Sequence, residues 1–177
     1  FCILFSVNAF ALKEEIVKEG NREYINVTLE SGDVVEIGEY SSLDESDDDS
    51  KLNVGSVTIN ATGDEPVVIG KFAFEANFDQ VESLTINGNG KVVIGTGAFL
   101  NTRIKELYLP QNVVFEDDTV AVFEDCWYLK SVEIGCDLCP YAFINCSIEN
   151  VTFTEDNDIK EIPEQAFSLG YFESFKL

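Results

Sequence analysis

One pattern recurs five times along the chain and constrains its fold more than any other feature. In each copy a small residue precedes a phenylalanine, and three apolar residues follow that are separated from one another by three and then two positions. The intervals between these phenylalanines are 25, 24, 20 and 24 residues, and the residues are Phe74, Phe99, Phe123, Phe143 and Phe167. A regular period of this length is typical of repeat proteins, whose units bury their apolar sides only against one another. The chain is therefore expected to fold as a stack of similar units.

The residues around each phenylalanine predict how one unit is built. The last two apolar residues of each set alternate with polar residues, which is the period of a half-buried strand. The residue before the phenylalanine is alanine, except for Val122. Another apolar residue stands five places before the phenylalanine, except where Asp118 occurs: Ile69, Ile94, Leu138 and Ile162. Each unit is predicted to contain two short strands and a turn, with its phenylalanine stacked inside the array.

The repeat resembles a known family. The segments IGTGAFLNTRIKELYL and VFEDCWYLKSVEI approximate the pattern I-G-x-x-A-F-x-x-C-x-x-L-x-x-V-x-I, which resembles that of the BspA-like leucine-rich repeat surface proteins of oral bacteria and mucosal protist parasites. Cys126 and Cys146 match its cysteine, whereas Asn77, Thr102 and Gly170 stand there in the other units. The likeness covers residues 67–177 and extends to a degenerate unit around residues 56–64. It implies a repeat solenoid, that is, a right-handed, leucine-rich-repeat-like stack of β-rich coils, and a cell-surface role in adhesion to host or matrix proteins or glycans.

The segment 12–55 lacks the Ala-Phe signature and is interpreted as an N-terminal cap with an acidic loop. Apolar residues alternate with polar ones at positions 25–29, the turn signal Ser31-Gly32-Asp33 follows, and a second apolar run covers positions 34–37. This order predicts an N-terminal β-hairpin. Residues 39–50 contain six acidic residues and no basic one. They are predicted to form a solvated loop between the cap and the array.

The two ends of the chain lead to two further predictions. Residues 1–11 are apolar and end in Ala9-Phe10-Ala11, a small-x-small pattern, so they are interpreted as the remnant of a signal peptide. The protein is therefore expected to be extracellular or on the cell surface. Residues 56–177 are assigned to the repeat array, with about five units plus the degenerate first one. Because the sequence stops at the apolar Leu177, this array is expected to be truncated at its C-terminus.

Charge and composition exclude several functions. The chain has 33 acidic and 11 basic residues, a formal net charge of −22, and no histidine. Such a negative field repels nucleic acid and anionic lipid headgroups, so neither is predicted as a partner. The absence of histidine excludes Ser-His-Asp and Cys-His catalysis. A carboxylate-using secreted hydrolase remains an alternative, because two acidic side chains can converge from distant units.

No cofactor is predicted. The acidic run around Asp47 and Asp49 suggests calcium, but Lys51 stands where an EF-hand needs a third oxygen ligand. The pairs Gly88-x-Gly90 and Gly95-x-Gly97 lack the third glycine of a dinucleotide fingerprint. A zinc site or a reactive Cys136-x-x-Cys139 pair is also disfavoured, because neither has the accompanying ligands or fold context.

If the chain is secreted, its cysteines are candidates for disulfide bonds and its Asn-x-Ser/Thr triplets are candidates for glycosylation. Cys126 and Cys146 both stand three residues after the phenylalanine of consecutive units, so they are predicted to form a disulfide. The alternative is a buried pair of free thiols, with Cys136 and Cys139 bonded to each other or free. Four Asn-x-Ser/Thr triplets are candidate glycosylation sites: Asn26, Asn60, Asn145 and Asn150.

The polar residues that alternate with the apolar strand positions are the candidate ligand surface. Those predicted to bind an extracellular protein or glycan are Thr85, Glu106, Tyr108, Ser131, Glu133, Thr152 and Lys176, and Ser83, Asn150 and Ser174 share their outward phase. We therefore predict a non-enzymatic binding module used in adhesion. The alternatives are that these residues merely face solvent, and that the protein is a structural surface coat. A glycan on Asn150 would conflict with ligand binding beside it.

Overall fold

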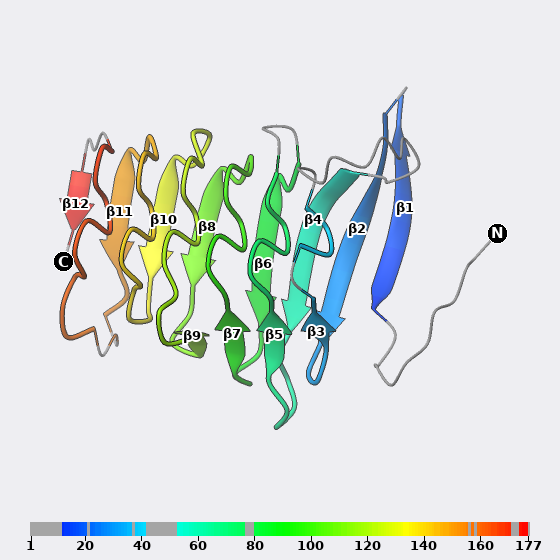
Figure 1. Ribbon diagram of the computed structural model, residues 1–177, viewed down its shortest axis with the longest axis horizontal. Helices are drawn as coiled ribbons and strands as arrows, with labels where there is room; N and C mark the ends of the chain where they lie inside the picture. The colour runs from blue at the N-terminus through cyan, green and yellow to red at the C-terminus, as the bar shows by residue number, and fades with distance from the viewer. Residues whose placement is uncertain are drawn as a thin grey trace.

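In the computed structural model the residues described are 12–20, 22–36, 38–41, 53–76, 80–155, 157, 159–170 and 174–176. Within them every helix-or-strand element is a β-strand (Figure 1). The signal-peptide remnant and nearly all of the acidic loop lie outside the described residues, so the interpretation of both segments stays a prediction.

The strands form three four-stranded sheets. In spatial order, the first sheet contains β1 (Lys13–Glu19), β2 (Arg22–Glu30), β4 (Asn53–Asn60) and β6 (Ser83–Asn87). The second sheet contains β8 (Glu106–Leu109), β10 (Ser131–Ile134), β11 (Asn150–Phe153) and β12 (Ser174–Lys176). The third sheet contains β3 (Val34–Val35), β5 (Val67–Ile69), β7 (Val92–Ile94) and β9 (Val113–Phe115). Figure 1 shows the first two sheets as one continuing row, with the third sheet along its lower side.

Parallel pairing between equivalent strands stacks the units in register. Leu107, Val132 and Val151 occupy the same ladder position on β8, β10 and β11, and all three are buried. The other described apolar strand positions follow the same rule, because a strand directs alternate side chains to opposite faces. Apart from Ile162, the described apolar residues predicted from the repeat therefore lie in the core or pack against it.

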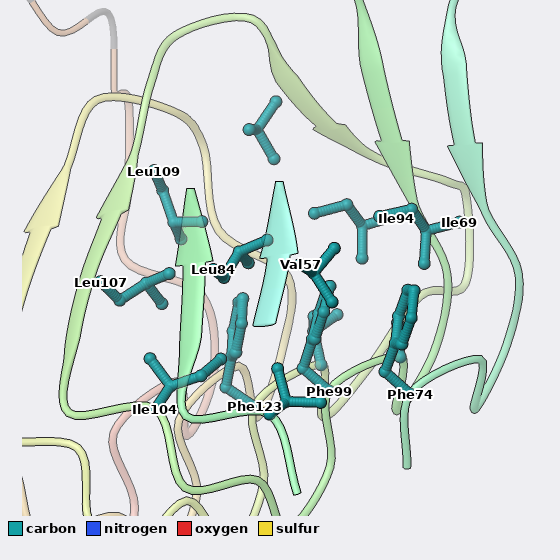
Figure 2. Close-up of a cluster of buried hydrophobic side chains, with 14 of the residues drawn as sticks. Val57, Ile69, Phe74, Leu84, Ile94, Phe99, Ile104, Leu107, Leu109 and Phe123 are labelled. Carbon is teal, nitrogen blue, oxygen red and sulfur yellow. The ribbon is translucent and has the colours of Figure 1, made fainter. Parts of the chain in front are cut away.

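The phenylalanines of the five units form one continuous ring stack, as predicted. Neighbouring ring centroids lie 5.3–5.6 Å apart from Phe74 to Phe167, with interplanar angles of 8–12°. Figure 2 shows Phe74, Phe99 and Phe123 side by side. This separation is close to the spacing of adjacent strands, about 4.7–4.9 Å, so each unit adds one ring in nearly parallel orientation.

The ring stack begins one unit earlier than the sequence indicated. Tyr40 lies parallel to Phe74, with centroids 5.1 Å apart. Its amide donates to the Ala73 carbonyl at 2.8 Å, just as the Phe74 amide donates to the Ala98 carbonyl at 2.8 Å. Burial and a hydrogen bond from its hydroxyl to Glu14 raise the pKa of Tyr40 above its ordinary value. Residues 39–41 are therefore part of the first unit, which corrects their assignment to a solvated loop.

The N-terminal hairpin exists but joins different strands from those predicted. The only antiparallel pair among the described strands is β1 with β2, and Gly20 follows β1 with a φ of 61°. The turn after β2 does not fold back, because β3 enters another sheet. There the Asp33 carbonyl accepts from Val68 at 2.9 Å, and Gly32 donates to Pro66 at 3.2 Å. The Ser31-Gly32-Asp33 turn is thus a corner of the first unit.

The backbone adopts a left-handed conformation on both sides of the rings. Two residues before the ring, φ is 54–61° in all five units, at Phe72, Gly97, Ala121, Tyr141 and Gln165. Two residues after it, φ is 58–62° at Asn101, Asp125, Asn145 and Leu169. A non-glycine residue in this region costs about 1–2 kcal/mol. Hydrogen bonds between units accompany the strained turns, including Phe99 N to Val122 O at 3.0 Å.

Two irregular units explain the exceptions in the repeat. Phe115, and not Asp118, pairs with Ile94 in the third sheet, because a longer connection separates this strand from Phe123. The next unit is shorter: its segment 135–140 contains no strand, which accounts for the interval of 20 residues between Phe123 and Phe143. In the last unit Ile162 is 43% exposed, although the repeat predicts a buried residue there.

Phe123→Ala is expected to lower the free energy of unfolding by about 3–5 kcal/mol. The ring is fully buried between Phe99 and Phe143, so its removal leaves a cavity in the middle of the ring stack. Urea denaturation followed by circular dichroism measures the change. A stability equal to that of the unmodified protein would contradict the role assigned to the rings.

The strained turn position gives a matched pair of substitutions with opposite effects. Gly97→Ala is expected to destabilise the protein, because a Cβ there would lie 2.5 Å from the Phe72 ring. Ala121→Gly, at the same place with a φ of 56°, is expected to stabilise it by about 1 kcal/mol. Thermal unfolding of both variants tests the pair. Equal shifts in the same direction would show that the turn conformation does not limit stability.

Candidate functional site

The outward side chains of the second sheet form two polar rows, which we call the strand face. One row contains Glu106, Ser131, Asn150 and Ser174, which are successive partners in the parallel register. The other contains Tyr108, Glu133, Thr152 and Lys176. The structure therefore brings together most of the residues predicted from alternation, in the order of the repeats.

Exposure differs along the strand face. Tyr108 is 47% exposed, and Glu106, Glu133, Asn150 and Ser174 are also exposed. Ser131 and Thr152 are half-buried, and the side chain of Lys176 is outside the described residues. Thr85 and Ser83 are exposed on β6, which belongs to the first sheet and lies beside β8 (Figure 1). The central part of the face is thus formed by β8, β10 and β11.

An open hollow of about 670 Å³ lies at the end of the strand face. Tyr108 and Glu133 from the face contribute to it. The remaining lining residues follow the strands and were not predicted: Asn89, Pro110, Gln111, Asn112, Thr154 and Glu155. Their sequence signal is the polar residues directly after β8 and β11, in PQN and TED. Amide, hydroxyl and carboxylate groups beside an exposed ring suit a ligand that offers hydrogen-bond donors.

Ion pairs between units lie where the strands begin. Lys130 and Glu149 approach to 2.9 Å, while Lys105 and Arg103 each lie 3.8 Å from Glu82. Such partly exposed pairs contribute little stability. Their consequence is electrostatic, because they engage the basic groups beside the face. Glu106 and Glu133 take part in no ion pair among the described residues, so the part of the face on β8 and β10 is negative.

Comparison with known proteins identifies the family. Residues 50–173 match the BspA type leucine-rich repeat region in six copies. The chain belongs to this family. No curated protein and no solved structure matches the chain. The six copies are one more than the five units that contain the repeated phenylalanine. The unit that contains β2, β3 and Tyr40 precedes the matched region.

Membership of the BspA type family indicates a protein-interaction or surface module. Leucine-rich repeat proteins of this kind are generally non-enzymatic binding modules, and BspA-like ones are typically surface-associated in bacteria. Among the described residues, no three His, Cys, Asp or Glu side chains are grouped as metal ligands. The described part of the chain also contains no helix that is long and apolar enough to cross a bilayer.

The four glycosylation triplets differ in accessibility. Asn145 and Asn150 are exposed, and the Asn150 side-chain oxygen accepts from Ser174 Oγ at 2.6 Å. Asn26 and Asn60 are half-buried in the first sheet. There Ser56 Oγ donates to Asn26 at 2.7 Å, and Asn87 Nδ2 donates to Asn60 at 3.0 Å. A glycan on Asn150 would cover the part of the strand face around Thr152.

The predicted disulfide between Cys126 and Cys146 is not formed in this structure, in which both are free, buried thiols. Equivalence in the repeat does place them in neighbouring units, as expected. However, each thiol donates to a carbonyl of the preceding unit, Cys126 to Phe99 at 3.3 Å and Cys146 to Phe123 at 3.0 Å. Thr102 stands in the same place one unit earlier, and its hydroxyl lies 3.3 Å from Cys126 Sγ. Hydrogen bonding between units therefore accounts for these side chains without a bridge.

Burial makes the thiols of Cys136, Cys139 and Cys146 unreactive. It raises the pKa of Cys136 to about 12 and that of Cys139 to about 11. Contact with Cys126 and burial raise the pKa of Cys146 above its ordinary value. A thiol is nucleophilic only as the thiolate, so none of these three is suited to redox chemistry near neutral pH.

All four described cysteines are expected to be alkylated by iodoacetamide only after unfolding, because each is at most 4% exposed. Peptide mapping without reductant, before and after denaturation, measures this directly. Recovery of a peptide that links Cys126 to Cys146 would contradict the free-thiol arrangement and restore the bridge predicted from the repeat.

Proposed function

We propose that the protein is an extracellular or cell-surface adhesion module whose strand face binds a protein or glycan of a host or matrix. The supporting observation is the register of the second sheet, which places the exposed Glu106, Tyr108 and Glu133 side by side on one surface. Flat arrays of polar side chains around an exposed aromatic ring suit recognition of an extended surface.

The negative charge and the hollow narrow the ligand chemistry. Tyr108 offers an aromatic face, while Glu133 and Glu155 offer acceptors at the rim of the same hollow. A ligand that presents hydroxyl, amide or basic groups complements this set. If Asn150 is glycosylated in the native source, the contact moves away from β11 toward Glu106, Tyr108 and Glu133.

A solenoid arrangement of the units would extend the strand face along the molecule. We infer that the units form a right-handed solenoid, because their parallel strands are joined by crossover connections, and such connections are right-handed in about 98% of cases. Stacking then extends the strand face by one pair of outward residues for each added unit. Secretion is supported by the apolar residues 1–11 and by the exposed triplets at Asn145 and Asn150.

Binding assays with a double variant test the proposal. The purified protein is expected to bind saturably to one or more host matrix proteins or arrayed glycans. Tyr108→Ala combined with Glu133→Ala is expected to weaken this binding at least about tenfold, since a buried aromatic contact carries much of an interface. Biolayer interferometry measures the affinity.

Tyr128→Ala is the matched control, because Tyr128 is 42% exposed but lies in a turn, where its ring contacts Arg103. This variant is expected to retain binding. Equal loss in both variants, or binding unaffected by the double variant, would contradict the strand face as the site. Absence of any saturable ligand would favour a structural coat, and turnover of glycoside substrates would favour a hydrolase.

A further inference from the structure

The third sheet ends before the array does. It contains β3, β5, β7 and β9, while the described units that follow contribute no strand to it (Figure 1). The unit directly after β9 is the short one, and its segment 135–140 contains no strand. The strand β9 is therefore an edge in the middle of the molecule.

The outer side of this edge is paired with no neighbouring strand among the described residues. Val92 donates to the Asn112 carbonyl at 3.0 Å, which fixes the phase of the ladder between β7 and β9. The backbone N–H and C=O groups of Val114 then point toward β7, whereas those of Val113 and Phe115 point toward the open side of the edge. The Val113 amide is satisfied by Pro110 at 3.1 Å. No backbone hydrogen bond joins β9 to residues 135–140, all of which the structure describes.

A groove occupies the place of the missing strand. One hollow of about 440 Å³ lies between Val113 and Phe115 on one side and Cys136 and Leu138 on the other. A second, of about 410 Å³, continues past the end of β9 to Pro140, and the two share Phe115 and Leu138. We call this continuous depression the edge groove. The apolar part of its lining, which we call the floor, consists of Val113, Phe115 and Leu138 together with Cys136 and Cys139, which are buried neutral thiols.

We propose that the edge groove binds an extended, basic peptide segment of a partner protein as an added strand of the third sheet. The Phe115 amide and the carbonyls of Val113 and Phe115 would pair with its backbone. Strand addition to an open sheet edge is a recurrent mode of peptide recognition. This site is separate from the strand face and does not depend on the function proposed for that face.

The neighbouring side chains specify which peptide fits. On the side of the third sheet that faces away from the core, one row of valine side chains crosses its four strands: Val34, Val68, Val93 and Val114. A β-branched aliphatic residue in the added strand would extend this row, because cross-strand neighbours pack against one another. Its inward side chains would fill the floor between Phe115 and Leu138.

Charge selects a basic peptide over a second copy of this chain. Glu116, Asp118 and Asp137 are exposed at the rim of the edge groove, and no lysine or arginine lines it. Two copies would bring these acidic groups together, and each chain carries a net charge of −22. Lysine residues at both ends of a short aliphatic segment satisfy the rim in either strand direction.

Fluorescence anisotropy with the labelled peptide Lys-Val-Ile-Val-Lys tests the proposal. The full chain is expected to bind it saturably, and the same peptide N-methylated on its central amides is expected to bind at least about tenfold more weakly. Hydrogen exchange of the Phe115 amide is expected to slow on binding. Equal affinity of the methylated peptide, or protection elsewhere without protection of Phe115, would overturn strand addition.

Matched charge variants locate the site. Asp137→Lys with Glu116→Lys is expected to weaken binding at least about tenfold, whereas Glu106→Lys with Glu133→Lys makes the same change of charge on the strand face and is expected to leave it nearly unchanged. All four positions are exposed. The unfolding midpoint of each variant is measured to verify that it folds. Equal loss in both pairs would show non-specific attraction and overturn the site. Sedimentation that reveals self-association with Phe115 protected in the absence of peptide would assign the edge to a second copy instead.

Discussion

The contact between one aromatic ring and the next holds this structure in register. Each ring lies against its neighbour at a distance close to the strand spacing. The backbone amide of the same residue donates a hydrogen bond to a carbonyl of the next unit, as Phe123 N does to Ala142 O at 2.9 Å. The surrounding turns adopt left-handed backbone angles even at Tyr141 and Gln165. Such strain persists only where packing and hydrogen bonding on both sides determine the conformation. The rings therefore fix the turns, and the turns fix the direction in which the strands leave.

Because the units are in register, the outward side chains at equivalent positions line up in rows and form continuous surfaces. On the second sheet, equivalent positions hold Glu106, Ser131 and Asn150, so a polar face follows from repetition alone. On the third sheet, the equivalent positions hold valines, and the row ends where the short unit begins. Departures from the repeat are thus as informative as the repeat. The strand face arises from regular units, and the edge groove arises from an irregular one.

The sequence predicted the features that depend on recurrence and missed those that depend on context. The ring stack and the outward phase of Tyr108 and Glu133 were predicted, because both follow from spacing. Tyr40 was missed because neither its ring type nor the residue before it matches the Ala-Phe signature. The hairpin was assigned to the wrong strands because Ser31-Gly32-Asp33 suits a hairpin turn and a corner between sheets equally well. Spacing placed Cys126 beside Cys146 but could not determine whether the thiols bond to each other or to carbonyls.

Native-state hydrogen exchange of the ring amides tests most directly whether the rings hold the units together. The amides of Phe74, Phe99, Phe123 and Phe143 each donate to a carbonyl of the next unit, at 2.7–3.0 Å. If the ring stack is one cooperative structure, these four amides exchange only through global unfolding, with one common free energy that falls in parallel as denaturant is added. Exchange of each amide with its own free energy, well below that of global unfolding, would show that the units open independently and would contradict this account.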